Sequence, residues 1–443
     1  MSYFRRNILS STRIFCRLNS QRIMSTVQAP KYASRLQGFD SPTVWQEFTP
    51  LANQYKSENL GQGFPDWETP EFVKKSMDRA IAGNFNQYCR SAGEPALVEA
   101  VAKFYGPLVG REINPLTEVT TSVGATEALF AIMQSLIDPG DQVLVLEPAF
   151  DIYTAQVQMA GGSCNFVTLQ LDKSTKKWEL DLAEFEAAIT PKTKIILLNN
   201  PHNPTGKVFT MEEMQGLADI VLRNPHVTVV TDEVYENLVY DGKQHIRLCS
   251  LPGMWDRVLT VSSSGKTFSC TGWKVGWVYG ASHLIKPVML ANQWVQFSVS
   301  TPTQRALAEV INEATEPYEG FPSYYHYVNN LYQTKRDRLA RALEAARMTP
   351  YVPDAGFFII ADTSAIEFPP SHMDEPGPDG TSPVSRDWGF ARWLTKDIGV
   401  TPIPPSAFYT PEHRHFASNM ARFAFCKTDE CIEAAAVKLI KLG

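Results

Sequence analysis

The sequence lacks the marks of a membrane-spanning, nucleic-acid-binding or disulfide-stabilised protein. Its 443 residues contain no apolar run long enough to cross a bilayer. They carry no excess of positive charge, since 41 lysines and arginines face 47 aspartates and glutamates, which argues against nucleic acid or a membrane as a partner. The seven cysteines are odd in number and form no CxxC pair, so we expect free thiols in a reducing compartment.

Two kinds of catalytic site are also missing from the sequence. It contains no G-x-S-x-G motif, which argues against a hydrolase with an activated serine. The close histidine pair, His413 and His415, has no nearby cysteine or convincing set of carboxylates. We therefore expect these histidines in a loop or on the surface, and we predict no metal site.

The first 39 residues differ from the rest of the chain because they contain no acidic residue. Five arginines lie before Met24, among serines and scattered apolar residues, which is the composition of a mitochondrial transit peptide. A disordered basic tail is the alternative. We expect residues 1–24 to be the transit segment. Met24 is a usable second start that would give a cytoplasmic form.

From about Thr69 onward, helical and strand patterns alternate. A cap, a proline and an acid at Thr69-Pro70-Glu71 open a helix, and Gly106-Pro107 is expected to end the helix Pro95–Tyr105. Short apolar runs typical of buried strands are Val119–Ser122, Gln142–Leu146, Lys194–Leu198, Thr228–Val230, Val258–Val261 and Val275–Val278. Intervening helices are expected at Gly124–Ile137, Phe150–Met159, Leu182–Ile189 and Met211–Leu222. This alternation predicts an α/β fold, with a mainly parallel sheet between helices and ligands at the carboxyl ends of its strands.

A second, smaller α/β unit is expected after the long helix Tyr324–Ala346. It contains the strands Phe357–Ala361 and Ala421–Phe425 and a helix at Trp388–Asp397. The stretch Glu367–Arg386 is rich in proline, glycine and acids and is expected to be a mobile surface loop. We therefore divide the chain into an N-terminal arm with part of the small domain (25–70), a large cofactor-binding domain (71–323) and a small C-terminal domain (324–443).

Lys266 is the most informative residue. It follows the apolar run Val258–Val261 and three serines, and Lys274 comes eight positions later. A lysine just after a strand, among hydroxyls, can form an imine with an aldehyde, while the hydroxyls and Lys274 hold a phosphate. This pattern is expected for pyridoxal phosphate (PLP). An exposed lysine in a serine-rich turn is the alternative.

Two other strand ends carry side chains suited to the pyridoxal ring. Asp232 follows the strand Thr228–Val230, where a carboxylate against the pyridine nitrogen would keep that nitrogen protonated. Tyr235 and Asn203 could donate to the phenolic oxygen of the ring. The alternatives are a helix cap or metal ligand for Asp232 and a plain turn around Asn203. Glu233 is expected to point away from the ring.

The remaining candidates would hold the phosphate, the ring and the substrate. Ala125 and Thr126 precede a helix, where backbone N–H groups bind phosphate, although an ordinary helix start fits equally well. Phe150 could stack on the ring or fill the core. Arg422 lies in an apolar strand and needs a partner, which is either a substrate carboxylate or an internal acid.

The motifs NNPHNPTG, TDEVY, SSSGKTFSCTGWKVGW and RFAFCK, in this order, resemble fold-type I PLP-dependent aminotransferases. The resemblance runs from about Ser34 to the end of the chain. The stretches LGQGFPDW, NQY and DGKQHIRLCSLPGMWDR resemble the branch of kynurenine aminotransferases, glutamine transaminase K and cysteine-S-conjugate β-lyases.

The resemblance implies a role for each candidate. Lys266 would be the Schiff-base lysine, Asp232 the partner of the pyridinium, and Tyr235 and Asn203 the partners of the phenolic oxygen. Ser263, Lys274, Ala125 and Thr126 would hold the phosphate, and Phe150 would stack on the ring. Arg422 and Asn203 would bind the substrate carboxylate, Gly63 would close over the substrate and Trp45 would line its pocket. Tyr88 would come from the other subunit of a homodimer.

The implied reaction is transfer of an amino group from L-kynurenine to a 2-oxo acid, giving kynurenic acid. A broader aminotransferase for glutamine, methionine and aromatic amino acids, with β-lyase activity on cysteine conjugates, is the alternative. A non-catalytic PLP-binding regulator is the rival from another class. It would need a DNA-binding module, and the N-terminal segment is too short for one.

Overall fold

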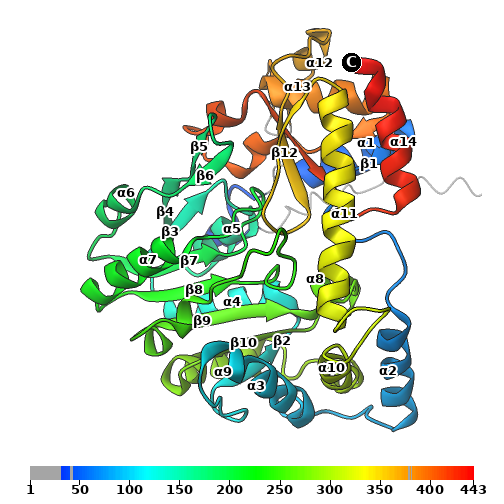
Figure 1. Cartoon of the computed structure of the whole chain (residues 1–443). Helices are drawn as coiled ribbons and strands as arrows, with labels where there is room; N and C mark the ends of the chain where they lie inside the picture. The colour runs from blue at the N-terminus through cyan, green and yellow to red at the C-terminus, as the bar shows by residue number, and fades with distance from the viewer. Residues whose placement is uncertain (1–30, 40–42, 378–379, 381) are drawn as a thin grey trace, which may run out of the picture.

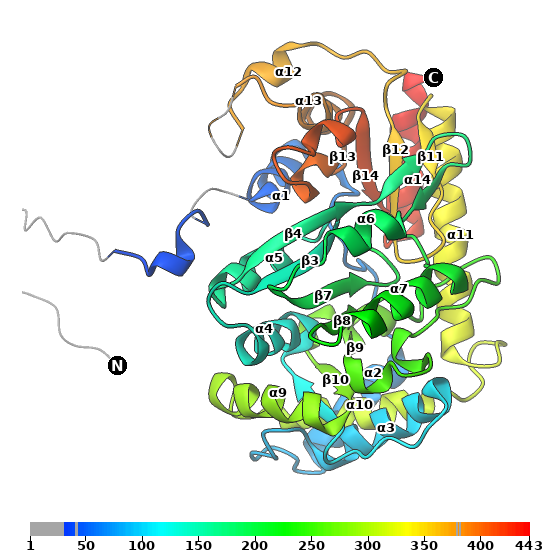
Figure 2. The same cartoon turned by 90° about the vertical axis from the view of Figure 1, so that its left-hand side faces the viewer.

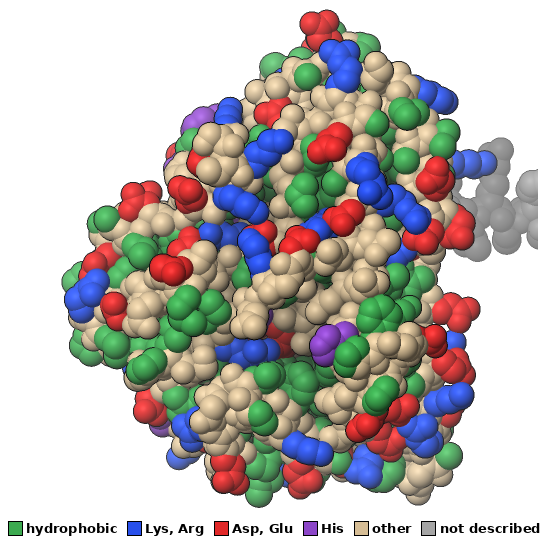
Figure 3. Space-filling view, in the orientation of Figure 1, with side chains coloured by type: hydrophobic (Ala, Val, Ile, Leu, Met, Phe, Trp, Pro, Cys, Tyr) green, Lys and Arg blue, Asp and Glu red, His purple; other side chains and the backbone are tan. Residues whose placement is uncertain are grey.

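The computed structural model describes residues 31–39, 43–377, 380 and 382–443 (Figure 1). The segment 1–24, with its expected transit function, lies outside these residues. None of the helices in the described part of the chain combines the length and the apolar character needed to cross a membrane. Lysine, arginine, aspartate and glutamate side chains are interspersed over the face shown in Figure 3.

The large unit is built on a seven-stranded sheet with the order β2-β10-β9-β8-β7-β3-β4. Its strands are β2 (Val119–Ser122), β3 (Gln142–Glu147), β4 (Ser163–Thr168), β7 (Thr193–Asn199), β8 (Thr228–Asp232), β9 (Val258–Ser263) and β10 (Gly276–Gly280). Only β10 in this sheet runs antiparallel to its neighbours, β2 and β9. The expected α/β class and mainly parallel sheet are confirmed.

Alternating side chains along the strands pack on two layers of helices, as Figure 2 shows from the side. On one face, Val143 and Val230 pack with α4 (Gly124–Leu136), α5 (Ile152–Met159) and α9 (Ser282–Val295). On the other, Leu144 and Val229 pack with α3 (Pro95–Val109) and α7 (Met211–Arg223). Helices therefore exclude water from both faces of the sheet, so a ligand can bind only at the ends of the strands.

The smaller unit follows α11 (Tyr324–Ala345), the long helix that runs beside both units in Figure 1. It contains an antiparallel sheet of β11 (Thr349–Tyr351), β12 (Phe358–Asp362) and β14 (Met420–Ala424), with α13 (Arg386–Trp393) and α14 (Asp429–Leu439). The N-terminal helix α1 (Val44–Tyr55) and strand β1 (Glu58–Asn59) join this unit, because β1 pairs in parallel with β13 (Val400–Thr401).

Three local expectations differ from the structure. Helix α3 continues past Gly106-Pro107 to Val109 and ends where Gly110, at φ 70°, donates its N–H to the carbonyl of Gly106. Thr69 does not cap α2 (Glu71–Ala82), because its hydroxyl donates instead to the carbonyl of Ser269, 2.8 Å away. The expected loop Glu367–Arg386 contains a short helix, α12 (Ser371–Asp374).

Candidate active site

Twelve of the predicted site residues line one cavity of about 350 Å³ at the carboxyl ends of the central strands. They are Trp45, Gly63, Ala125, Thr126, Phe150, Asn203, Asp232, Tyr235, Ser263, Lys266, Lys274 and Arg422. They come from α1, the start of α4, the short helix α8 (Ser264–Thr267) and β14, from the ends of β8 and β9, and from loops that follow β1, β3, β7 and β8 or precede β10. Residues spread over most of the chain are thus brought together where the fold predicts a ligand.

Lys266 lies in the floor of this cavity, one turn into α8. Its ammonium donates to the carbonyl of Gly63 at 3.1 Å and lies 5.2 Å from the centre of the Phe357 ring. Burial lowers the pKa of the amine, and nearby Asp232 only partly opposes this effect. The amine therefore loses its proton more readily than a lysine in solvent, as a nucleophile or a base must.

Asp232 is buried at the end of β8, on the face of the sheet covered by α4 and α5. Its Oδ2 accepts a hydrogen bond from the hydroxyl of Tyr153 at 2.7 Å, and its Oδ1 accepts from the N–H of Val234 at 3.3 Å. Burial raises the pKa of this carboxyl despite the two donors. A cationic ring nitrogen would stabilise the carboxylate, since a buried charge without a counter-charge is costly.

The start of α4 offers a site for an anion. Gly124, at φ 73°, opens the helix, and Ala125 and Thr126 follow it in the cavity wall. A side-chain carbon built on Gly124 would lie only 3.3 Å from the Nζ of Lys274, so glycine lets this ammonium approach the helix. Ser263 completes the group. Helix N–H groups, a hydroxyl and an ammonium together suit a phosphate.

Arg422 lies on β14 in the opposite wall and is almost fully buried. Its Nη2 donates to the carbonyl of Gly61 at 3.0 Å and its Nη1 to the Oδ1 of Asn203 at 3.4 Å, while its Nε is buried with no partner among the described residues. The rings of Phe358, Phe408 and Trp45 surround the guanidinium with centres 3.9, 4.7 and 5.4 Å away. Burial lowers its pKa to about 10, so it remains charged at neutral pH.

These observations fit PLP and an amino acid better than an ordinary core. A lysine, a buried carboxylate and an anion site surround one space, and the Arg422 guanidinium, with an unpartnered Nε, faces the same space. Of the alternatives left open by the sequence, an exposed lysine at 266 and an internal acid bonded to Arg422 are both excluded within the described residues. The unfilled bonding capacity of Arg422 suits a carboxylate from outside the chain.

Tyr88 is the predicted site residue that does not reach this cavity. Its side chain is 82% exposed and lies edge-on against Phe297, with ring centres 5.1 Å apart. Leu290, Trp294 and Val295 are also exposed nearby in sequence, and the exposed fraction of Trp294 is 83%. We call Tyr88, Leu290, Trp294, Val295 and Phe297 the apolar patch.

Among the cavity residues that the sequence did not indicate, two contact the side chains of Asp232 and Arg422. Tyr153, the partner of Asp232, lies three positions after Phe150 in the same segment, so helical spacing could have placed both on one face. Phe358 packs on Arg422, but the sequence indicated only that it lies in a strand and nothing about a role in the site. Glu233 points away from the cavity as expected. His413 lies in a loop as expected, but its Nδ1 is 2.5 Å from the Oε2 of buried Glu147, a carboxylate contact that the sequence did not suggest.

Comparison with known proteins gives concordant matches. A model of the family "Aminotransferase class I and II" matches residues 56–439. The kynurenine–oxoglutarate transaminase of Dictyostelium discoideum is 45% identical over 414 residues, which cover 90% of this chain and 94% of that protein. Kynurenine–oxoglutarate transaminase 1 of Homo sapiens is 40% identical over 422 residues, covering 92% and 97%. The solved structure of YbdL from Escherichia coli, with a methionine aminotransferase function, has a TM-score of 0.83 at 30% identity, covering 93% of this chain and 100% of that one.

Proposed function

The chain belongs to the class I and II aminotransferases, which are PLP-dependent enzymes of fold type I, and on this premise we propose that it transfers the amino group of L-kynurenine to a 2-oxo acid. The observation that carries the proposal is the pairing, in one cavity, of the partly buried Lys266 with an Arg422 whose guanidinium has no carboxylate bonded to it. The Lys266 amine suits proton transfer at the substrate, and the Arg422 guanidinium suits binding of the substrate carboxylate.

Different residues around the substrate would bind its carboxylate and its side chain. The Arg422 guanidinium binds the carboxylate and the Asn203 amide supports it, which fixes the direction of the Cα–H bond. Trp45 and Phe150 present flat apolar surfaces to the side chain, as an aromatic amino acid requires. No second arginine lines the described part of this cavity, so a large apolar side chain is favoured over a second carboxylate.

When bound, PLP supplies an electron sink for the pair left by the Cα–H bond. The Asp232 carboxylate, oriented by Tyr153, holds a proton on the ring nitrogen. Tyr235 and Asn203 orient the phenolic oxygen, and Ser263, Lys274 and the N–H groups of Ala125 and Thr126 fix the phosphate. The Lys266 amine takes the proton from Cα. Position 63 must be glycine, because any side chain there would collide with the rings of Phe357 and Phe358.

A substrate panel tests the proposal. The protein is purified with PLP and supplied with kynurenine, glutamine, methionine and phenylalanine, each with several 2-oxo acids, while product formation is followed by chromatography. We expect kynurenic acid from kynurenine, with turnover lost if PLP is removed. Turnover of methionine or glutamine without kynurenic acid would favour the broader alternative, which the likeness to YbdL supports. No amino transfer to any acceptor would reject both.

We also propose that the enzyme is a homodimer in which the apolar patch lies between subunits. Solvent-exposed aromatic side chains of this size are characteristic of association surfaces. Tyr88 in the patch would then complete the partner's cavity. The variant Trp294→Glu should sediment as a monomer with little activity, and Ile440→Glu, at a residue exposed elsewhere, should remain a dimer. A wild-type monomer in sedimentation would reject this assembly.

For localisation, we propose import into mitochondria directed by residues 1–24, with a shorter cytoplasmic form starting at Met24. The support is the arginine-rich, acid-free composition of this segment. Cell fractionation of the full chain and of Met24→Ala tests the proposal. We expect the variant to lose its cytoplasmic fraction and to keep its mitochondrial fraction. A full chain found only in the cytoplasm would reject it.

A further inference from the structure

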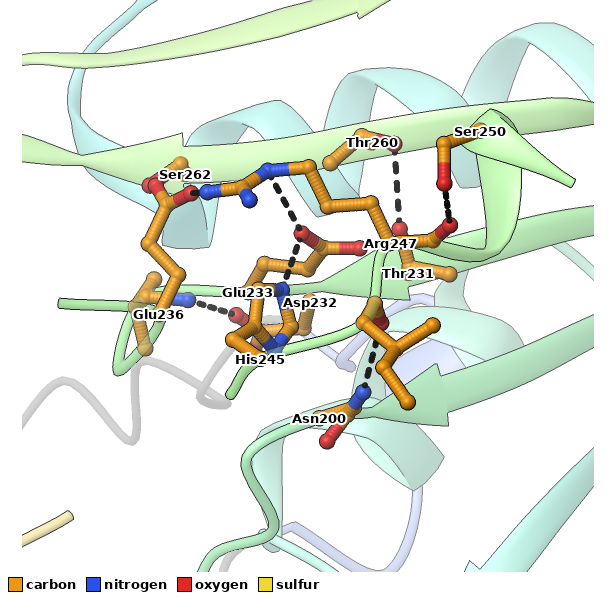
Figure 4. A network of polar contacts seen from close by, with 12 residues as sticks. Asn200, Thr231, Asp232, Glu233, Glu236, His245, Arg247, Ser250, Thr260 and Ser262 are labelled. Carbon is orange, nitrogen blue, oxygen red and sulfur yellow. Dashed lines mark hydrogen bonds and ion pairs between the residues drawn. The ribbon is translucent and has the colours of Figure 1, made fainter. Parts of the chain in front are cut away.

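The face of the sheet opposite the cavity carries a cluster of buried charged side chains that the proposed reaction does not use (Figure 4). It consists of Glu233 and Glu236, in the turn after β8, and His245 and Arg247, in the segment Asp241–Arg257 that the sequence analysis singled out. Their side chains are 1%, 1%, 3% and 9% exposed. We call these four residues the rear cluster.

Glu236 is the centre of the rear cluster. Its carboxylate accepts hydrogen bonds from the Tyr105 hydroxyl, from Nη2 of Arg247 and, at 2.5 Å, from the Ser262 hydroxyl. The Nε of Arg247 lies 3.8 Å from Oε2 of Glu233, and the same oxygen is 2.7 Å from Nε2 of His245. The spacing of the two carboxylates and the imidazole would suit a metal ion, but the Arg247 guanidinium already supplies the positive charge between them.

The neighbours of these residues in the sequence face the cavity. Asp232 and Tyr235 line the cavity, whereas Glu233 and Glu236, in the turn that follows β8, do not. Ser263 lines the cavity and Ser262 does not, because successive side chains leave β9 on opposite faces. The hydrogen bond from Ser262 to Glu236 therefore links two segments that both carry cofactor-site residues, and it does so on the side of these segments that faces away from the cavity. One segment bears Asp232 and Tyr235. The other bears Ser263 and, after the start of α8, Lys266.

We propose that Glu236, held by Arg247, is a positioning residue for the cofactor. Its carboxylate fixes the separation between the ring-binding pair, Asp232 and Tyr235, and the phosphate and lysine groups at Ser263 and Lys266. A hydrogen bond to a buried, ion-paired carboxylate is stronger than one between neutral groups, so this link is stiffer than the surrounding strand contacts. The proposal rests on the PLP site described above.

The test compares two hydroxyl deletions on the same face of the same two strands. Ser262→Ala removes the bond to Glu236. The control, Thr260→Val, removes the 3.2 Å hydrogen bond between Thr231 and Thr260, two residues further from the cavity and outside the rear cluster. Each holoenzyme is examined for the rate of PLP release, for the pH at which the visible absorbance of bound PLP changes, and for its unfolding midpoint.

We expect Ser262→Ala to release PLP about tenfold faster than the wild type and to shift the pH midpoint of the absorbance. Thr260→Val should leave both unchanged while lowering the unfolding midpoint by a similar amount. Equal effects of the two variants on the cofactor would overturn the proposal, as would a Ser262→Ala variant that behaves like the wild type. A wild-type protein that fails to bind PLP would instead reject the proposed function.

Glu236→Gln provides a second measurement. It keeps the shape of the side chain and can still accept from Ser262, but it leaves Arg247 with Glu233, 3.8 Å away, as its only carboxylate partner in the rear cluster. We expect faster PLP release than in Ser262→Ala. Release at the wild-type rate from a folded Glu236→Gln protein would contradict the role given to the charge. If this variant does not fold, the comparison of Ser262→Ala with Thr260→Val decides the proposal.

Discussion

Arg247 and Arg422 are both buried arginines, and they differ in what surrounds them. Arg247 contacts the two carboxylates of the rear cluster. Burial opposes its charge, but the attraction of Glu236 and Glu233 outweighs burial and raises the pKa of the guanidinium. Arg422 has an amide, a carbonyl and three aromatic rings as neighbours, and burial lowers its pKa. A buried cation with carboxylate partners contributes to the fold, and one without them is available to a ligand.

The largest expected effect involves a third basic residue, the partly buried Lys266. Lys266→Ala should fold normally yet lose turnover by about four orders of magnitude or more, together with the visible absorbance of bound PLP, because both functions need this amine. Lys207→Met is the matched control, since this buried lysine pairs with Glu213 at 2.7 Å outside the cavity. It should lose stability and keep turnover. Normal activity of Lys266→Ala would end the assignment of this site.

Arg247→Met should have the largest effect on stability. It leaves Glu233 and Glu236 buried without their cation, so the free energy of unfolding should fall by about 3–5 kcal/mol. Urea unfolding followed by circular dichroism measures the loss. A wild-type unfolding curve would show that the two carboxylates do not need Arg247, and the distinction between the two arginines would fail.

Arg422→Met should give the opposite result. It removes a buried charge to which no carboxylate is hydrogen-bonded. The attraction of Asp151 does not offset burial, which lowers the pKa of the guanidinium, so stability should stay the same or rise. The KM for the amino acid should increase by about a hundredfold, since a paired hydrogen bond to the carboxylate is lost. Steady-state kinetics and urea unfolding on one preparation measure both. Arg422→Lys should recover only part of the affinity, and unchanged kinetics in Arg422→Met would remove this residue from the site.

The smallest effect is expected from Tyr153→Phe. It deletes the 2.7 Å hydrogen bond to Asp232, so the affinity for PLP should fall by about tenfold, while turnover at saturating PLP changes little. Tyr351→Phe is the control, because it deletes a tyrosine–aspartate contact, to Asp362 at 3.4 Å, far from the cavity. PLP titration of the apoenzymes measures the difference, and equal affinities would assign Tyr153 to packing alone.

Much of this molecule could be predicted from the sequence, because the signals were local. Continuous apolar runs located most of the central strands, and Asn203, Asp232 and Lys266, which follow three of these runs, located the cavity. Strand β4, with the sequence SCNFVT, lacked such a run and was missed. The pairing of Arg247 with Glu236 was also missed, since alternation along a strand shows that a side chain points away but not what it meets there. The exposed position of Tyr88, against Phe297 and outside the cavity, also had no local signal in the sequence.

The pairing of β1 with β13 has a consequence for how the protein is made. Glu58 aligns with Val400 and Asn59 with Thr401, so 342 positions separate each partner from the other. A ribosome must emit nearly the whole polypeptide before this short ladder can close, whereas the large unit between them has all its strands much earlier. Helix α1 buries Val44 and Phe48 against residues near the end of the chain, so these apolar side chains remain exposed until nearly all of the polypeptide has been made.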